Sequence, residues 1–402
     1  MKPQTFDHPP DGGWGWCVLF SSMVVRLMAF GTSSLAGVII RALQSTLTDN
    51  SAVDTIWVTS LYIGFSLCMC PVGAYFNDRY STRPAMIIGA TLSTVGLFLS
   101  FFASKVHYLH ISYGVMTGIG HAFLHAAHLP ILAKYFDKRF AFATGIACLG
   151  GDLGYFLFSP MIQLFVDKYG LRGAFLVMSA INAHAFACAT VMRPINVISQ
   201  DKVNPNPNES TNGCCKKIVH RLGFRLHCTH HGFALMMFAT FFAALAYFSS
   251  LSLIIPHAVE IGVTELKATF LVATVGITSM AIKTIQGWCI DRYNIRALYL
   301  LPMLILMLGV SQLTMAVATT FPVMVVSCVL CGICNGVYSP SLYMSINEMV
   351  GATNFSRGNG IIVLYFGVAG IIGSQTGGKN FSFENLVNLK NQITDFLRKW
   401  LL

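Results

Sequence analysis

Eleven long apolar runs follow one another along this chain of 402 residues, and they constrain its fold more than any other feature. Each run is long enough to cross a bilayer, which takes roughly 20 consecutive apolar residues in a helix. Only helices or closed barrels satisfy the backbone in hydrocarbon, and runs this long without polar alternation are not barrel strands. We therefore predict an all-α multi-pass membrane protein with spans at 16–40, 56–76, 84–104, 109–133, 141–165, 171–192, 233–256, 268–290, 297–318, 322–346 and 358–376.

Charged residues make up only 10% of the chain, and the mean hydropathy is +0.63. Soluble domains carry roughly 25% charged residues, so this composition suits lipid and excludes a soluble enzyme. The sequence has no phosphate-binding loop and no convincing nucleophile or metal-ligand set, so we expect no enzymatic activity, no cofactor and no metal. Lys and Arg in cytoplasmic loops explain the net charge of +10, so we expect the lipid bilayer as a partner and no nucleic acid.

A polar segment at 193–232, which contains Pro, Asn and Lys, interrupts the apolar runs near the middle of the chain. It separates a first transmembrane half, 16–192, from a second half, 233–376. Loop Lys and Arg concentrate on the side that holds residues 1–15 and 193–232, so the positive-inside rule makes the N-terminus and the central loop cytoplasmic. Residues 377–402 form an atypical tail.

The two halves share a charged motif. The sequence DRYSTR follows the span 56–76 and DRYNIR follows the span 268–290, so Asp78 and Asp291 are 291 − 78 = 213 residues apart. Two copies at equivalent span ends indicate duplicated halves. Two related six-helix units resemble the major facilitator superfamily, in which such loops carry charges that hold the inward face shut. The alternative is that these cations only anchor cytoplasmic loops. Under the resemblance, the gating residues are Asp78, Arg79, Arg83, Asp291, Arg292 and Arg296.

Two further motifs narrow the resemblance. Residues 11–16 read DGGWGW at the start of the first span, and residues 134–160 open with KYFDKR and contain spaced glycines. Together they resemble the monocarboxylate transporter family, over residues 10–373. The resemblance implies alternating-access transport of a small monocarboxylate or related organic anion at the plasma membrane, often together with a proton. Some relatives require a single-span immunoglobulin-type accessory glycoprotein. We add Lys138 and Arg139 to the gating residues.

Lys283 is the leading candidate for binding the substrate carboxylate. In the lactate and pyruvate carriers of this family, the first span has a functional lysine where this chain has Ser34. Their eighth span has an Asp and an Arg four residues apart, where this chain has Ser279 and Lys283. The resemblance therefore makes Ser34 and Ser279 further candidates for substrate binding. An intramembrane cation costs roughly 2.5 to 3.5 kcal/mol at a helix centre, so it is usually retained for a partner. The alternative is that Lys283 extends toward the inner interface.

Two other charged residues lie within predicted spans. Arg26 is too deep in the first span to reach the interface easily, and it is a candidate for a second anion-binding cation. Asp152 stands where the family usually has an uncharged residue. It is a candidate member of a proton or polar relay, or the buried counter-ion of Arg26 or Lys283, and the sequence leaves these alternatives open.

His121, His125 and His128 are spaced i, i+4 and i+7, which places them on one face of a helix. Histidine titrates near neutral pH, which favours a proton relay or a polar cavity wall. One alternative is that the three side chains only form hydrogen bonds between helices. The other is a metal site, which a single helix without a nearby acid disfavours.

The chain departs from the family pattern after Gly373, because no normal helix 12 follows. Apolar residues recur at helical spacing over 384–400, which predicts an amphipathic helix at the membrane interface, with a soluble tail as the alternative. The departure also leaves an alternative function open. A variant without helix 12 can fold and insert without transporting, and then acts as an assembly or regulatory partner.

Overall fold

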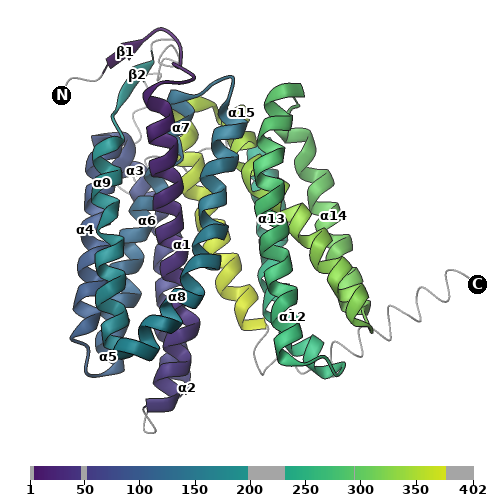
Figure 1. Ribbon diagram of the computed structural model, residues 1–402. Helices are drawn as coiled ribbons and strands as arrows, with labels where there is room; N and C mark the ends of the chain where they lie inside the picture. The colour runs from purple at the N-terminus through teal and green to yellow at the C-terminus, as the bar shows by residue number, and fades with distance from the viewer. Residues whose placement is uncertain (1–3, 47–51, 198–230, 294, 377–402) are drawn as a thin grey trace, which may run out of the picture.

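The computed structural model describes residues 4–46, 52–197, 231–293 and 295–376. Long helices stand side by side in two groups, α1 to α9 and α12 to α15 (Figure 1). The first group comprises α1 (Trp14–Thr46), α2 (Ala52–Cys68), α3 (Cys70–Tyr80), α4 (Thr82–Phe101), α5 (Val106–Leu109), the π-helix η1 (His110–Thr117), α6 (Gly118–Ala127), α7 (Pro130–Tyr135), α8 (Phe140–Asn182) and α9 (His184–Val191). The second comprises α12 (His231–Glu260), α13 (Glu265–Tyr293), α14 (Ala297–Val317) and α15 (Phe321–Thr376).

The helix lengths confirm the predicted all-α, multi-pass fold. Within the described residues, ten helical stretches are long and apolar enough to cross a membrane, and one of them, Phe140–Val191, has 52 residues. Gly170 interrupts that stretch with a φ of 70°, a left-handed conformation that glycine adopts without steric cost. The chain turns back there, so this stretch supplies two of the predicted spans. The predicted tail at 377–402 lies outside the described residues.

Two predicted spans are divided into shorter helices. The span 56–76 is broken at Met69, and Pro71 lies at the start of the helix α3 that follows, where its missing N–H costs no hydrogen bond. The span 109–133 contains the π-helical segment η1 and a second proline, Pro130, at the start of α7. π-Helical turns often lie at functional sites, and this one ends one turn before His121.

The DGGWGW motif packs against two connections of the first half. The backbone N–H of Asp11 donates to the carbonyl oxygen of Tyr135 over 3.0 Å. The indole of Trp14 donates to the carbonyl oxygen of Val191 over 2.9 Å, and the Arg193 guanidinium lies over the same ring, 4.1 Å from its centroid. A short parallel pairing of β1 (Gln4–Phe6) with β2 (Ile195–Val197) extends this contact. The N-terminal segment is therefore joined to the start of the central loop.

The two halves contact each other along two helix pairs that the internal repeat relates. A Cβ on Gly145 of α8 would lie 2.8 Å from the carbonyl oxygen of Lys283 on α13. A Cβ on Gly360 of α15 would lie 3.3 Å from the carbonyl oxygen of Cys70 on α3. Lys283 and Cys70 are 283 − 70 = 213 residues apart, which is the spacing of the repeated DRY motif. The two glycines, Gly145 and Gly360, are 360 − 145 = 215 residues apart, so the repeat relates the two contacts to within two residues.

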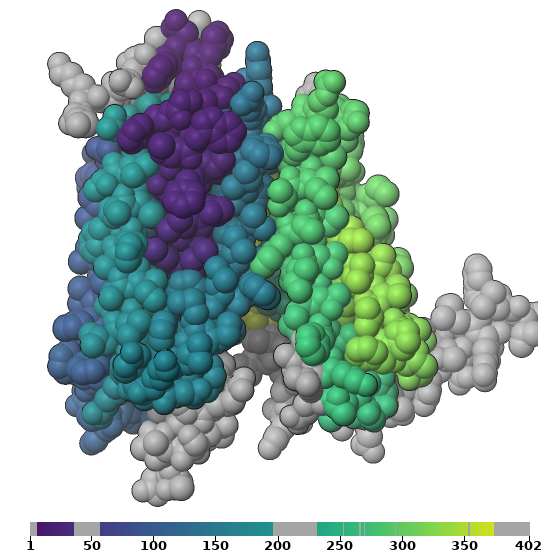
Figure 2. Space-filling model, viewed as in Figure 1, coloured from purple at the N-terminus to yellow at the C-terminus, as the bar shows by residue number. Residues whose placement is uncertain are grey.

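The halves are joined at the end of the bundle where α1, α8 and α14 begin, which we call the joined end. Figure 2 shows the two halves touching in the upper part of the view and diverging toward the lower part. A Cβ on Gly287, at the joined end of α13, would lie 2.8 Å from the carbonyl oxygen of Ala141 on α8. Gly276 lies three turns away on the same face of α13 and has nothing within 4 Å of its Cβ position. The helices α8 and α13 therefore separate with distance from the joined end.

Candidate functional site

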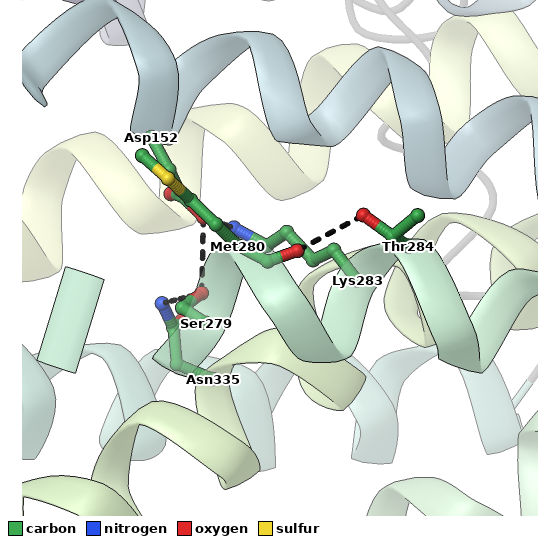
Figure 3. Close-up of polar contacts among 6 residues, drawn as sticks. All are labelled: Asp152, Ser279, Met280, Lys283, Thr284 and Asn335. Carbon is green, nitrogen blue, oxygen red and sulfur yellow. Dashed lines mark hydrogen bonds and ion pairs between the residues drawn. The ribbon is translucent and has the colours of Figure 1, made fainter. Parts of the chain in front are cut away.

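Lys283 lies in the contact between the halves and is bonded to Asp152. Its Nζ donates to Asp152 Oδ2 over 2.6 Å, and its side chain is 4% exposed. Ser279, one turn earlier on α13, donates its hydroxyl to the same oxygen over 3.0 Å, and Asn335 of α15 donates to Ser279 Oγ over 3.3 Å. These four side chains come from α8, α13 and α15 and point toward one another (Figure 3).

The first half supplies the carboxylate that the eighth span lacks. Asp152 contacts both Ser279 and Lys283, the two residues that the resemblance places at the Asp and Arg positions of the lactate carriers. The sequence left open whether Asp152 pairs with Arg26 or with Lys283, and the structure places it on Lys283. Removing one partner of a buried ion pair costs about 3–5 kcal/mol because the other charge is left without compensation. Asp152 is 18% exposed and keeps its Ser279 contact, so the cost here falls at the lower end of that range.

Arg26 is a second buried cation near this pair. It is 7% exposed, and its guanidinium lies over the rings of Phe30 and Tyr343, 5.1 and 5.5 Å from the two centroids. Its Nε has no hydrogen-bond partner and lies 3.3 Å from the Cβ position of Gly151, the neighbour of Asp152. Among the described residues no acidic side chain forms an ion pair with Arg26. The positive charge of Arg26 therefore suits an anion.

Ser34 is bonded within its own helix. Its hydroxyl donates to the carbonyl oxygen of Gly31 over 2.6 Å. The neighbouring Ser33 donates to Tyr62, whose own hydroxyl donates to the carbonyl oxygen of Ala29 over 3.0 Å. A role for Ser34 in substrate binding therefore stays a prediction from the resemblance.

His121 belongs to a hydrogen-bonded network inside the first half. Its Nδ1 lies 2.7 Å from the hydroxyl of Tyr62, and its Nε2 lies 3.2 Å from Oδ1 of Asn182. Asn182 in turn donates to Ser93 over 2.7 Å. The imidazole thus connects α2, α6 and α8, which is the arrangement of a histidine that bonds between helices.

His125 and His128 have different surroundings from His121. The ring of His125 packs against Phe30 with 5.4 Å between centroids, and its backbone oxygen accepts a hydrogen bond from Asn359 of the second half. Nδ1 of His128 donates to the carbonyl oxygen of Leu124 over 2.9 Å, whereas its buried Nε2 has no partner. The relay through these histidines stays a prediction. In the described part of the chain, no group of three or more His, Cys, Asp or Glu side chains is placed to hold a metal.

The two copies of the DRY motif connect the halves at the joined end. Asp78 of α3 accepts a hydrogen bond from Arg357 Nε of α15 over 3.1 Å, and Asn77 donates to Ser356 over 3.2 Å. Asp291 of α13 accepts the backbone N–H groups at the start of α8, over 3.2 Å and 2.8 Å. A carboxylate at a helix N-terminus satisfies donors that the helix leaves free and interacts favourably with the helix dipole. Each acidic residue of the repeat therefore bonds to a helix of the opposite half.

The predicted gating cations lie at the same end, in different roles. Arg83 donates to the carbonyl oxygens of Thr190 and Met192 at the end of α9, over 2.6 and 3.1 Å. The guanidinium of Arg139 lies 5.9 Å from the centroid of a Trp16 ring. Arg296 is the residue before α14, and the side chains of the remaining three are exposed: Arg79, Lys138 and Arg292.

Three contact residues were missed by the sequence analysis. Asn335 and Tyr343 are polar residues within an apolar span, and their polarity was the sequence feature that could have identified them as candidate site residues. Arg357 contacts Asp78 across 279 residues of sequence, so no local motif joins the two.

A comparison with protein families defines the class of this protein. Residues 18–374 match the family model described as the Major Facilitator Superfamily, so the chain is a membrane transporter of that superfamily and not an enzyme. It is 30% identical over 380 residues to monocarboxylate transporter 3 of Rattus norvegicus, covering 94% of this chain and 76% of that protein. It is 28% identical over 371 residues to monocarboxylate transporter 12 of Xenopus laevis, covering 88% of this chain and 80% of that protein. The chain belongs to the monocarboxylate transporter family.

Solved structures share the fold at low sequence identity. FucP, a Major Facilitator Superfamily transporter crystallised in the outward conformation, superposes with a TM-score of 0.67 at 16% identity, covering 92% of both chains. The human organic anion transporter MFSD10 superposes with a TM-score of 0.65 at 12% identity, covering 90% of this chain and 92% of that one. At these identities the likeness shows the fold alone.

Proposed function

We propose that this protein carries small monocarboxylate anions across the plasma membrane by alternating access. The observation that carries the proposal is the central charge cluster, which we define as Arg26, Asp152 and Lys283. Among the described residues, two cations and one carboxylate leave one positive charge without an ionised partner. An isolated buried charge is unfavourable, and a carboxylate anion of the substrate would compensate it.

The proposed movement separates the halves at the joined end. We propose that residues 1–15 and 193–232 lie in the cytoplasm, and that the halves 16–192 and 233–376 move against each other. The bonds of Asp78 and Asp291 then close the cytoplasmic side in the state described here. Because the Lys283–Asp152 pair also crosses the interface between the halves, it must break when this end opens.

A proton is the proposed coupling ion, with Asp152 as one member of its path. Two structural neighbours are described as proton symporters, of fucose and of xylose, which supports the proposal by analogy of fold. His121, His125 and His128 are the proposed path of the proton within the first half.

The experiment is uptake by proteoliposomes that contain the purified full chain. The panel contains lactate, pyruvate, an aromatic carboxylate and a zwitterionic amino acid, each tested with and without an inward proton gradient. We expect uptake of at least one monocarboxylate, and its loss in the Lys283→Gln variant with the folded protein retained. Lys267→Gln is the matched control, because Lys267 is an exposed lysine on the same helix.

Two results decide against parts of the proposal. Uptake by Lys283→Gln at the rate of the unsubstituted protein would remove Lys283 from the site. A folded, membrane-inserted protein that transports no member of the panel would favour the alternative of an assembly or regulatory partner. Repeating the uptake in cells with and without co-expressed immunoglobulin-type glycoprotein tests whether an accessory subunit is required.

A further inference from the structure

The charge of the central cluster can be counted from its contacts. Lys283 and Asp152 compensate each other at 2.6 Å, and Nε of Arg26 lies 3.3 Å from the Cβ position of Gly151, the residue before Asp152. Two cations and one anion give a net charge of +1. In the described part of the chain, the polar side chains in contact with these three are uncharged, Ser279 and Tyr343, and Asn335 is bonded to Ser279.

The histidines that face Arg26 do not add to this count. The Nδ1–H of His128 donates to a backbone oxygen, and its Nε2 is buried without a partner. That pattern fits a neutral imidazole, since a charged ring would bury a second donor with nothing to accept its proton. His125 is 8% exposed and lies beside both Phe30 and His128, with no carboxylate paired to it among the described residues. A cationic ring there would stand next to Arg26 without compensation.

We propose that Asp152 is a specificity-determining residue that sets this net charge and thereby admits monoanions and excludes dianions. The inference rests on the proposed transport function and adds to it the residue that makes the site selective for the charge of the substrate. A monoanion brings the cluster to neutrality. A dianion would bring it to −1 in a site largely closed to water, where its second carboxylate would be repelled by Asp152.

The position of Asp152 explains why this role falls on it. Its carboxylate oxygen accepts the Ser279 hydroxyl, and Ser279 is the residue that the resemblance places at the acid of the eighth span in the lactate carriers. The acid therefore reaches the site from the opposite half, and α8 contributes no other charged residue between Phe140 and Pro160. Loss of this one side chain changes the net charge from +1 to +2.

The experiment compares succinate with lactate as probes in proteoliposomes that contain the full chain. Asp152→Asn should raise the ratio of succinate to lactate uptake by about tenfold or more, because the substitution removes one repulsive unit charge from a partly desolvated site. The double variant Asp152→Asn with Asn335→Asp returns the net charge to +1 with both cations retained, and it should return the ratio to its original value. The matched control is Asp167→Asn, the same substitution on α8 at an exposed aspartate bonded to Gln163, and its ratio should not change.

Binding provides a readout that does not depend on turnover. Thermal stabilisation of the detergent-purified protein by succinate and by lactate should change in the same direction as the uptake ratio. If Asp152→Asn does not fold, Asn335→Lys provides the same net charge of +2 with the ion pair retained, and it should raise the ratio in the same way.

Three outcomes overturn the inference. The first is that the unsubstituted protein carries succinate as well as it carries lactate. The second is that a variant of charge +2 shows an unchanged succinate-to-lactate ratio in both uptake and binding. The third is that the double variant keeps the raised ratio. An unsubstituted protein that carries and binds neither anion overturns the proposed function itself. The two failures are therefore distinguishable.

Discussion

Replacement of Asp291 by alanine should shift the protein away from the state in which the halves are joined. The carboxylate accepts two backbone N–H groups at the N-terminus of α8, from Ala141 and Phe142. Loss of an N-terminal cap costs about 0.5–2 kcal/mol, and loss of a favourable charge at a helix dipole costs about 0.3–1 kcal/mol. The two effects overlap, so we expect a total of about 1–2 kcal/mol, which corresponds to a shift of about 5- to 30-fold in the ratio of joined to open protein.

The repeated motif provides a matched comparison. Asp78 forms one ion pair with Arg357, whose side chain is 35% exposed, and such pairs contribute about 0.2–1 kcal/mol. Asp78→Ala should therefore shift the same ratio by less than about fivefold. The ratio can be measured from the distance distribution between spin labels at Tyr80 and Tyr293, the exposed tyrosines of the two motifs, in a background without accessible cysteines. The reasoning is refuted if Asp291→Ala leaves the distribution unchanged while Asp78→Ala broadens it.

Three further predictions follow from the packing and from the ion pair. Gly150→Ala should abolish the folded peak in size-exclusion chromatography, because the new Cβ would collide with the carbonyl oxygen of Met23. Gly276→Ala should be tolerated, because nothing lies within 4 Å of its Cβ position. Equal recovery of both variants would contradict the close approach of α1 and α8. His121→Ala should lower the Tm of the purified protein, because Tyr62 and Asn182 lose a buried partner at a cost of about 1–3 kcal/mol, and an unchanged Tm would show that the network is not needed. Exchanging the charges, with Asp152→Lys and Lys283→Asp together, should recover expression or uptake that each single variant loses; no recovery would end the pairing.

The membrane fold was predictable because hydrophobicity and length are local properties of each span. The runs from 16–40 to 358–376 gave the spans, and the motif that contains Asp78 and Asp291 gave the duplication. The internal breaks were missed, although Pro71 and Pro130 mark them, because an apolar window does not register where a backbone donor is absent.

The contacts of the candidate site were only partly predictable. The sequence identified Lys283, Arg26 and Asp152 as intramembrane charges, since such residues are rare in spans. It could not decide which cation Asp152 would contact, because that depends on the rotation of α8 relative to α1 and α13. The role of Arg357 could not be predicted for a related reason, since its contact with Asp78 exists only after the two halves associate.

Counterflow of radiolabelled lactate and pyruvate in proteoliposomes tests the central claim most directly, because trans-stimulated exchange needs a carrier that binds the anion and alternates. We predict counterflow by the unsubstituted protein and by Lys267→Gln, and none by Arg26→Gln or Lys283→Gln, because each of these removes one of the two buried cations. No counterflow by the unsubstituted protein, or counterflow at its full rate by both Arg26→Gln and Lys283→Gln, would contradict the account.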